Sequence, residues 1–232
     1  MRRLHPAAGQ APNVDRDGLG ALYGVDRPDG PGRPWLGLCM VASLDGSTSL
    51  AGRSGALGND NDRAVLSALR RAADVILVGA GTVAVEGYRP PRKDGQRIAV
   101  VTSRLRLDLD SELFRSGAGL LVLPADGPET PPGIDAIRAG TGVVDLRAAL
   151  VALAALIGGA RFVQAEGGPQ LNGALLEAGC VDEINLTIAP LLTGGPDGRI
   201  VAGASESARR FEPAHVLADD DGYLFTRWVR RR

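Results

Sequence analysis

Short, continuous apolar runs are the feature that most constrains the fold of this chain. VILVG occupies residues 75–79, and RIAVVTS at 97–103 and GLLVLPA at 119–125 are of the same type. Such runs are too short for buried helices and are typical of strands covered on both faces, as in a parallel sheet. Segments with the spacing of amphipathic helices, at 61–74 and 144–158, alternate with strand-like runs. The pattern predicts an α/β fold, with a mostly parallel central sheet and helices on both faces.

The rest of the chain follows the same plan and ends in an antiparallel C-terminal edge. The expected elements are a strand at 35–43, a cap at Asn59 or Asp60 for the helix at 61–74, a strand in RFVQAEGG at 161–168, a helix at 169–179 that Gly179 stops, and a strand in 181–195. Residues 213–230 have the pattern of a hairpin whose turn lies at Asp221-Gly222. We expect surface loops at 126–135 and 189–199.

The composition divides the chain into a short extension and one larger domain. Residues 34–232 can bury one sizeable core, because 44% of the 232 residues are hydrophobic. Residues 1–33 are rich in Pro, Gly, Ala and charged residues, and they contain little apolar area to offset the entropy of ordering. We therefore expect a flexible N-terminal extension over 1–33, with room for a short helix at 18–24, and a single domain over 34–232.

Several function classes lack their signals in this sequence. A formal net charge of -1 gives no electrostatic reason to bind nucleic acid or an anionic membrane, so the partner is expected to be a small molecule. His5 and His215 are the only histidines, and neither lies in a cluster spaced to bind a metal. A GxSxG motif is absent, which argues against a serine hydrolase of that type.

The cysteines and the N-terminus indicate a cytoplasmic protein. Cys39 and Cys180 form neither a CxxC pair nor a disulfide framework, which fits a reducing compartment. The first residues lack the apolar stretch of a signal peptide, and no segment is long and apolar enough to cross a bilayer.

Two strands run through glycines directly into helices, in VILVGAGTVA at 75–84 and in FVQAEGGPQLNGALL at 162–176. Such a turn points free backbone N–H groups and the positive end of a helix dipole at one place, where a phosphate is stabilised. A single turn, such as that of Gly79 and Gly81, is equally well explained by close packing of a strand against a helix. Two turns on one sheet favour an anion site.

The first of these turns also bears on the choice of cofactor. Gly79-x-Gly81-x-x-Ala84 fits the Ala-ending form of the dinucleotide fingerprint, although a single match is weak. The next strand ends in Thr102, Ser103 and Arg104. In NAD sites this position carries Asp or Glu, which binds the ribose 2′-hydroxyl. If a dinucleotide binds, a hydroxyl and an arginine favour the 2′-phosphate of NADPH.

Two acidic residues follow buried strands. Asp45 lies in ASLDGS and Glu166 in QAEGG, both at the carboxyl end of a strand, where α/β sheets place ligands. Asp45 with Gly46 is equally well explained as a solvated turn. Glu166 is harder to explain that way, because it directly follows a buried strand and precedes a helix.

Three segments together resemble a known family. MVASLDGSTSLAGRSGALG (40–58), LRRAADVILVGAGTVAVEGYRP (69–90) and VQAEGGPQLNGALLEAGCVDEINLTIAPLLTGG (163–195) are similar to the pyrimidine reductase domain of riboflavin biosynthesis, which has a dihydrofolate-reductase-like fold. The resemblance covers about residues 34–230. We expect the stand-alone form, because the extension is too short for a deaminase domain and carries no His/Cys zinc motif.

The resemblance implies NADPH-dependent reduction of a phosphoribosylamino-pyrimidine to its ribitylamino product. A carboxylate beside the imine carbon could stabilise a cation or supply a proton, and Asp45 is the candidate. Glu166 would also face the substrate, and Arg70, Tyr88 and Arg89 would hold its phosphate or ribose. A solvated helix face explains Arg70 equally well. The cofactor residues implied are Ala42, Thr82, Glu86, Ser103, Gly167, Gly168, Pro169, Gln170 and Leu171, beside Gly79 and Gly81.

Two departures from the family keep alternatives open. Many bacterial members have a lysine where this chain has Cys39, and a tryptophan after SG where this chain reads ALGNDND. A dihydrofolate or other pteridine reductase on the same fold, and a non-catalytic nucleotide-binding protein, are the alternatives. The sequence does not choose between the deaminated and non-deaminated pyrimidine. The helix at 169–179 and the strand INLTIAPLL at 184–192 could form the face of a homodimer.

Overall fold

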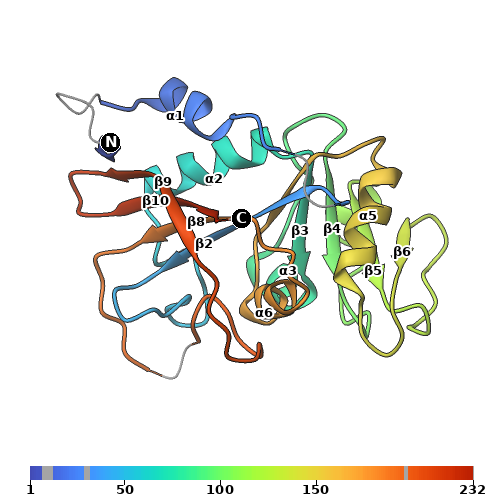
Figure 1. The fold of residues 1–232 in the computed structure, drawn as a ribbon. Helices are drawn as coiled ribbons and strands as arrows, with labels where there is room; N and C mark the ends of the chain where they lie inside the picture. Colours follow the sequence, from blue (N-terminus) through green and yellow to red (C-terminus); the bar gives the residue numbers. More distant parts are fainter. Residues whose placement is uncertain (7–12, 29–31, 196–197, 232) are drawn as a thin grey trace.

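The structure is a computed structural model that describes residues 1–6, 13–28, 32–195 and 198–231. All of its strands join in one sheet. The ten strands follow the order β1-β9-β10-β8-β2-β7-β3-β4-β5-β6 (Figure 1). Their bounds are β1 Arg2–His5, β2 Trp35–Ala42, β3 Val75–Gly79, β4 Arg97–Val101, β5 Gly119–Leu123, β6 Ala136–Arg138, β7 Phe162–Ala165, β8 Glu183–Ile188, β9 Phe211–Ala218 and β10 Leu224–Arg230. The helices are α1 Arg16–Tyr23, α2 Asp60–Ala72, α3 Ala80–Glu86, α4 Glu112–Arg115, α5 Leu146–Leu156 and α6 Pro169–Glu177.

The pairing confirms a mostly parallel sheet with an antiparallel C-terminal edge. Strands β8, β2, β7, β3, β4, β5 and β6 pair in parallel, whereas β10 pairs antiparallel with both β8 and β9, and β1 pairs antiparallel with β9. The β9–β10 turn lies where the Asp-Gly pair predicted it, and Gly222 adopts a φ of 86° that favours glycine.

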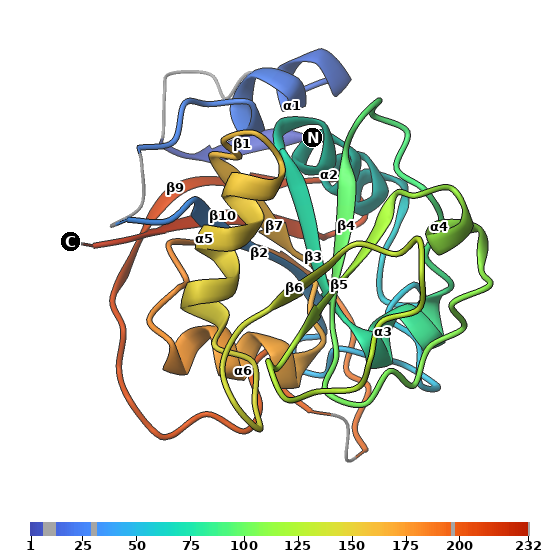
Figure 2. The ribbon, with the colours of Figure 1, turned by 90° about the vertical axis from the view of Figure 1, so that its right-hand side faces the viewer.

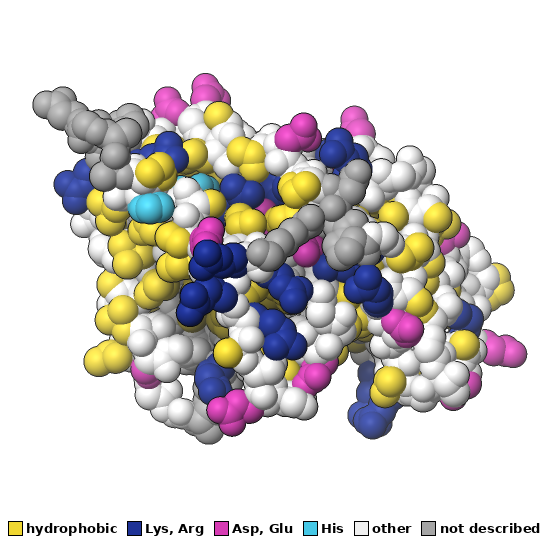
Figure 3. Space-filling view, in the orientation of Figure 1, with side chains coloured by type: hydrophobic (Ala, Val, Ile, Leu, Met, Phe, Trp, Pro, Cys, Tyr) yellow, Lys and Arg dark blue, Asp and Glu magenta, His cyan; other side chains and the backbone are white. Residues whose placement is uncertain are grey.

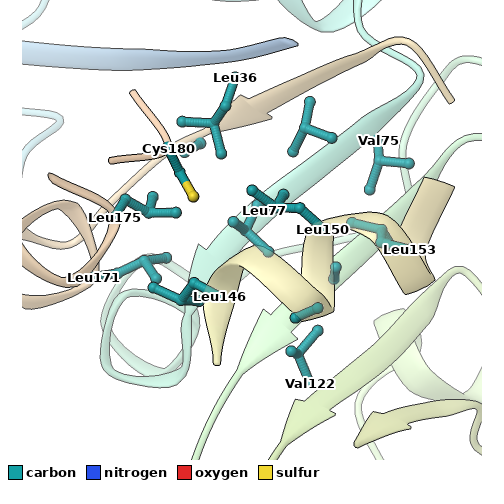
Figure 4. Close-up of a cluster of buried hydrophobic side chains, with 14 of the residues drawn as sticks. Leu36, Val75, Leu77, Val122, Leu146, Leu150, Leu153, Leu171, Leu175 and Cys180 are labelled. Carbon is teal, nitrogen blue, oxygen red and sulfur yellow. The ribbon is translucent and has the colours of Figure 1, made fainter. Parts of the chain in front are cut away.

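Helices cover both faces of the parallel part, as predicted. Figure 2 shows α5 and α6 on one side of the strands and α3 and α4 on the other. On the first side, Leu150 of α5 and Leu175 of α6 pack against Leu36 and Leu77 (Figure 4). On the other side, Leu113 and Phe114 of α4 pack against the alternate residues of β3, β4 and β5. Both faces of these strands are therefore buried, which explains their continuous apolar runs.

Local signals at the helix ends agree with the predicted boundaries. Asn59 rather than Asp60 caps α2, since its side chain accepts a hydrogen bond from the N–H of Asp62. Helix α6 begins at Pro169 and ends before Gly179, which has a φ of 65°. The short elements α4 and β6 are absent from the sequence prediction, because four and three residues are too few to show a period.

The described part of residues 1–33, for which the sequence predicts a flexible extension, packs against the rest of the domain. Strand β1 adds an edge to the sheet beside β9, and α1 buries Leu19 and Tyr23 against α2 and the antiparallel strands. A helix near 18–24 was expected, but its packing was not. This segment contains little apolar area, but ion pairs of Arg27 and Arg33 also hold it. Residues 7–12 and 29–31 of the extension lie outside the described residues.

Ion pairs join the N-terminal segment to two buried acids at the start of β8. Glu183 has no solvent exposure and accepts hydrogen bonds from Arg27, through Nε at 2.9 Å and Nη2 at 2.8 Å, and from Nη2 of Arg227 at 2.9 Å. Arg33 binds both oxygens of the neighbouring Asp182. Burial alone would raise the pKa of Glu183, but the hydrogen bonds from Arg227 and Arg27 lower it to about 2.

A buried histidine near this cluster predicts a pH dependence of stability. His215 is 2% exposed, and its ring meets Tyr23 edge-on at 4.9 Å between centroids. Burial, and then the charges of Arg227 and Arg3, lower the pKa of His215 to about 4, although Glu183 opposes this shift. Since the unfolded chain binds this proton below about pH 6.5, stability is lost as the pH falls from about 6.5 towards 4, by about 2 kcal/mol at pH 5.

Replacing the histidine tests this linkage. In His215→Phe the ring contact with Tyr23 can persist, but no proton binds at this position. We expect the urea unfolding free energy to fall less between pH 7.5 and pH 5 in the variant than in the parent protein. An equal fall in both proteins would exclude His215 as the titrating group.

Candidate active site

A cleft of about 1970 Å³ opens at the carboxyl ends of the parallel strands. Its walls come from β2, α2, α3, the segments after β3 and β4, and the start of α6. Thirteen of the residues predicted for the site line it: Arg70, Gly79, Gly81, Thr82, Glu86, Tyr88, Arg89, Ser103, Glu166, Gly168, Pro169, Gln170 and Leu171. Residues that are far apart in the sequence meet here, because the carboxyl ends of parallel strands share one edge of the sheet.

The two glycine corners adjoin each other at this edge. The N–H of Gly79 donates to the carbonyl of Gly167 at 2.7 Å, and a Cβ on Gly168 would lie 2.9 Å from Oγ1 of Thr82. Neither α3 nor α6 has a side chain capping its N-terminus, so the N–H groups of both first turns remain available, except at Pro169, which has none. A Cβ on Gly81 would meet no protein atom within 4 Å, so this glycine borders open space in the cleft. Both explanations of the glycines therefore apply: close packing at Gly168, and access to the backbone at Gly81.

The segment after β4 forms a further part of the wall. Oγ1 of Thr102 accepts hydrogen bonds from the N–H groups of Arg104 and Leu105, so this buried residue shapes the turn. Ser103 and Arg104 line the cleft, together with Arg106. Within the described part of the chain, neither arginine forms an ion pair with an acid. Their charge is available to an anionic ligand.

Glu166 stands at the centre of a cluster of hydrogen bonds in the cleft. Arg70 binds both of its oxygens, through Nε at 2.7 Å and Nη2 at 2.6 Å, and the hydroxyl of Tyr88 donates to it at 2.6 Å. Nε2 of Gln164 adds a bond of 2.7 Å. Burial and the charge of Glu166 raise the pKa of Tyr88 well above its usual value, so its hydroxyl keeps its proton.

This cluster excludes a purely solvated role for Arg70 and adds a residue that the sequence analysis missed. The side chain of Arg70 is 36% exposed, so it can still contact a ligand from the cleft while Glu166 fixes its orientation. Gln164 lies inside the buried run FVQA, and a polar residue in a fully buried strand is the signal that could have identified it.

Glu86 and Arg89 occupy different parts of the wall. Glu86 accepts hydrogen bonds from both N–H and Oγ of Ser54, each at 2.9 Å, and so joins α3 to the segment after β2. Arg89 is exposed, and Arg92, three residues further along the chain, also lines the cleft. These two cations make the end of the cleft beside Tyr88 positive.

The structure places three of the predicted residues outside the cleft lining. Ala42 is buried inside β2, and Gly167 lies against the sulfur of Met40. Asp45 is exposed, and its carboxylate accepts hydrogen bonds from Ser43 and from the N–H groups of Thr193 and Gly194, at 3.2 and 2.7 Å. The sequence analysis located its strand end correctly, but could not show that the segment after β8 binds its carboxylate.

These hydrogen bonds determine the charge of Asp45. The Ser43 hydroxyl, followed by the N–H groups of Gly194 and Thr193, holds the pKa of the Asp45 carboxyl well below its usual range. Asp45 is therefore an anion at neutral pH and a poor proton donor. Of the two roles considered for it, stabilising a cation fits better than supplying a proton.

The described residues contain neither a cluster of metal ligands nor a membrane-spanning helix. Among these residues no group of three or more His, Cys, Asp or Glu side chains is arranged to hold a metal ion. None of the described helices has the length and apolar character that crossing a membrane requires.

Comparison with curated proteins finds archaeal and bacterial relatives. The chain is 31% identical to the 2,5-diamino-6-ribosylamino-4(3H)-pyrimidinone 5′-phosphate reductase of Methanothermobacter thermautotrophicus, over 72% of this chain and 82% of that protein. The protein of the same name from Archaeoglobus fulgidus is 26% identical, over 84% and 97%. The riboflavin biosynthesis protein RibD of Bacillus amyloliquefaciens is 30% identical over 71% of this chain, which spans only 47% of that protein.

Solved structures share the fold. A pyrimidine reductase-like protein from Corynebacterium diphtheriae superposes with a TM-score of 0.75 at 24% identity, covering 86% of this chain and 92% of that one. The dihydrofolate reductase of Enterococcus faecalis superposes with a TM-score of 0.51 at 13% identity, over 85% and 97%, which confirms the dihydrofolate-reductase-like fold. The RibD C-terminal domain profile matches residues 34–225. The chain therefore belongs to the RibD C-terminal domain family, as its sequence resemblance predicted.

Proposed function

We propose that this protein is an NADPH-dependent reductase of riboflavin biosynthesis that converts a phosphoribosylamino-pyrimidine into its ribitylamino product. One observation carries the proposal: the oriented Arg70–Glu166 pair and the uncapped glycine corners line the same cleft. A phosphorylated substrate and a dinucleotide can therefore meet there. Family membership and the reductase names of the archaeal relatives support the oxidoreductase assignment.

The residues present fit a nicotinamide dinucleotide. The free N–H groups at the starts of α3 and α6 suit its pyrophosphate, and the open space at Gly81 lets that group approach the backbone. Ser103 and Arg104 would hold a 2′-phosphate. When bound, the cofactor supplies the hydride.

The reaction adds a hydride to C1′ of the ribose and a proton to its ring oxygen. Opening of the ribose ring breaks the bond between C1′ and the ring oxygen, which takes a proton from solvent and becomes the 4′-hydroxyl. The amino nitrogen keeps its hydrogen and forms a protonated imine with C1′, and hydride transfer to C1′ converts this imine into the secondary amine without a further proton. A protonated imine is the better hydride acceptor, and in the proposal the anionic Asp45 stabilises its positive charge.

The remaining side chains position the substrate. Glu166 fixes the guanidinium of Arg70 at the cleft surface, and Arg89 and Arg92 add positive charge nearby. The proposal assigns the substrate phosphate to these arginines, because a guanidinium can donate two hydrogen bonds to one phosphate group.

Turnover assays distinguish the proposed function from its alternatives. Purified protein and NADPH are incubated with the deaminated pyrimidine phosphate, the non-deaminated one, or dihydrofolate, and absorbance at the NADPH band is followed. We expect oxidation with a pyrimidine phosphate. Turnover of dihydrofolate alone would assign a pteridine reductase. A rise in melting temperature with NADPH, but no turnover of any substrate, would assign a non-catalytic nucleotide-binding protein.

Arg104 provides the test of NADPH against NADH. Removing its guanidinium in Arg104→Ala should weaken NADPH binding about tenfold or more, because a hydrogen bond to a charged group contributes about 1.5–3 kcal/mol. NADH has no phosphate at this position, so its affinity should stay nearly constant. Fluorescence titration of both cofactors measures the two dissociation constants, and an equal loss for both would contradict a 2′-phosphate site at Arg104.

The proposal includes a homodimer that forms through the antiparallel part of the sheet. Strand β8 turns Glu183, Asn185 and Thr187 towards the buried side, so Ile184, Leu186 and Ile188 lie on the opposite face and are only half buried. Figure 3 shows hydrophobic side chains gathered over these strands, at the left of the view. A second copy would cover this apolar face.

Placing a charged residue at the centre of this apolar face tests the dimer. We expect a dimer by light scattering for the parent protein and a monomer for Leu186→Arg, because the interface would then bury an unpaired charge. A parent protein that is monomeric at micromolar concentration would contradict the proposal.

The proposal also places the reaction in the cytoplasm. Cys39 and Cys180 are both free thiols in the structure. Thiols remain reduced in the cytoplasm, which agrees with the absence of a disulfide between these two cysteines.

A further inference from the structure

Asp62 is an acidic residue in the cleft that the proposed mechanism does not use. It lies in the first turn of α2, half buried, and it lines the same cleft as Arg70 and Glu166. A Cβ on Gly58 would lie 2.5 Å from its Oδ2, so the absence of a side chain at 58 leaves room for the carboxylate. The arrangement gives Asp62 a defined place in the wall of the site.

The surroundings of Asp62 balance the charge of its carboxylate only in part. The side chain of Thr187 forms a hydrogen bond with the carboxylate of Asp62. Among the described residues, no arginine or lysine forms an ion pair with Asp62. Burial raises the pKa of Asp62, and the hydrogen bond from Thr187 and the charge of Arg63 oppose this only in part. A carboxylate withdrawn from water needs donors, and a ligand in the cleft can supply them.

A role in stabilising the helix does not account for this position. An acid in the first turn stabilises a helix dipole, but Asp60 of the same turn already does so from solvent, with its side chain 91% exposed and paired to Arg63 at 2.5 Å. Asp62 would be as effective on the outer face without the cost of burial. Its placement in the cleft therefore points to a ligand.

Asp62 and the Glu166 cluster lie at two places along one cleft wall. Arg70 follows Asp62 by eight residues on α2, which corresponds to about 12 Å along the helix axis. Both acids are near Cys39 of β2: burial first, and then the charges of Glu166 and Asp62, raise the pKa of that thiol. If the arginines hold the phosphoribosyl part, Asp62 is in reach of the heterocycle.

The chemistry of a carboxylate selects one edge of such a ring. A 2-amino-4-oxopyrimidine presents two parallel donors, the N3–H and the 2-amino group, which match the two oxygens of a carboxylate. The deaminated 2,4-dioxopyrimidine presents its N3–H between two carbonyls, so one carboxylate oxygen would face another acceptor. An unpaired acceptor in a partly buried site is costly, and this cost creates selectivity.

We propose that Asp62 binds the N3–H and 2-amino edge of the substrate and makes the enzyme selective for the non-deaminated pyrimidine. This inference rests on the proposed function and adds to it a residue that determines specificity. A dihydropteridine carries the same 2-amino-4-oxo edge, so the test must distinguish these two sources of one recognition chemistry.

The experiment compares Asp62→Asn with the matched variant Asp60→Asn, which removes an acid from the same helical turn but outside the cleft. Initial rates are measured at saturating NADPH with the non-deaminated pyrimidine phosphate, its deaminated counterpart and dihydrofolate. For the parent protein we expect preference for the non-deaminated pyrimidine. In Asp62→Asn we expect its KM to rise about 10- to 100-fold, since the asparagine amide cannot accept both donors. The deaminated compound should lose little or gain, because the amide N–H can face its carbonyl.

Each outcome decides between the inference and the function on which it rests. Unchanged discrimination in Asp62→Asn, equal effects of both variants, or a parent protein that prefers the deaminated pyrimidine would overturn the role of Asp62 but leave the reductase intact. Turnover of dihydrofolate alone, lost in Asp62→Asn, would keep the recognised edge but overturn the pyrimidine as its source. No turnover of any substrate would overturn both.

Discussion

Glu183→Gln is expected to lower the free energy of unfolding by about 3–5 kcal/mol, because it leaves buried guanidinium groups without a carboxylate. The side chains of Arg27 and Arg227 are 4% and 11% exposed, and both pair with the fully buried Glu183. The amide keeps the shape of the glutamate but not its charge. Urea unfolding followed by tryptophan fluorescence measures the loss, since Nε1 of Trp35 donates to Glu183 and so reports on this cluster.

An exposed pair between β9 and the residue after β10 provides the matched control. Glu212 lies 3.2 Å from Arg231, and both side chains are about 60% exposed. Glu212→Gln should change stability by less than about 1 kcal/mol, because solvent screens the pair. Equal effects of the two variants would show that burial of Glu183 does not carry the stabilisation.

The pH dependence of the Glu183 variant has a defined direction. The folded-state pKa of about 2 lies below the ordinary glutamate value of 4.5, so the stabilising contribution is present above about pH 4.5. It is lost as the pH falls towards 2. The difference between the parent protein and Glu183→Gln should therefore narrow over that range.

This cluster shows why the sheet could be predicted from local sequence, whereas the packing of the N-terminal segment could not. Strands β3, β4 and β5 are buried on both faces, so each strand is a continuous apolar run that could be identified from its own residues. The packing of the described part of the N-terminal segment depends on contacts such as that of Arg27 with Glu183, which are 156 residues apart. Composition over a local window contains no information about such a partner.

The same distinction applies to the candidate site. That the two glycine corners would share one edge followed from parallel pairing and was confirmed by the contact of Gly79 with Gly167. The pairing of Arg70 with Glu166 spans 96 residues, and the sequence left it open whether this arginine was solvated. Asp60 and Asp62 look alike as acids at the start of a helix, and only the three-dimensional structure separates the exposed one from the one in the cleft.

Asp45→Asn is expected to lower kcat for the pyrimidine about 10²- to 10³-fold, the typical loss when one group that stabilises transition-state charge is removed. Asp45 follows β2 at the cleft edge of the sheet, and the segment that begins there contributes Thr48 and Ser49 to the cleft wall. The substitution removes the negative charge and leaves the side chain the same size. Affinity for NADPH should be unaffected, because the residues assigned to the cofactor are unchanged.

Because Asp45 also joins two loops, its structural and chemical roles must be measured separately. Thr193→Val removes a hydroxyl that lies 3.3 Å from the Asp45 carboxylate but retains the charge and the N–H groups of Thr193 and Gly194. If charge is what matters, Thr193→Val keeps most of the parent kcat, while Asp45→Asn loses it at an unchanged melting temperature. If loop anchoring is what matters, both variants lose activity in proportion to their loss of stability. A kcat for Asp45→Asn within about twofold of the parent value would assign the stabilisation of the imine cation to another group, since solvent alone does not replace a fixed carboxylate.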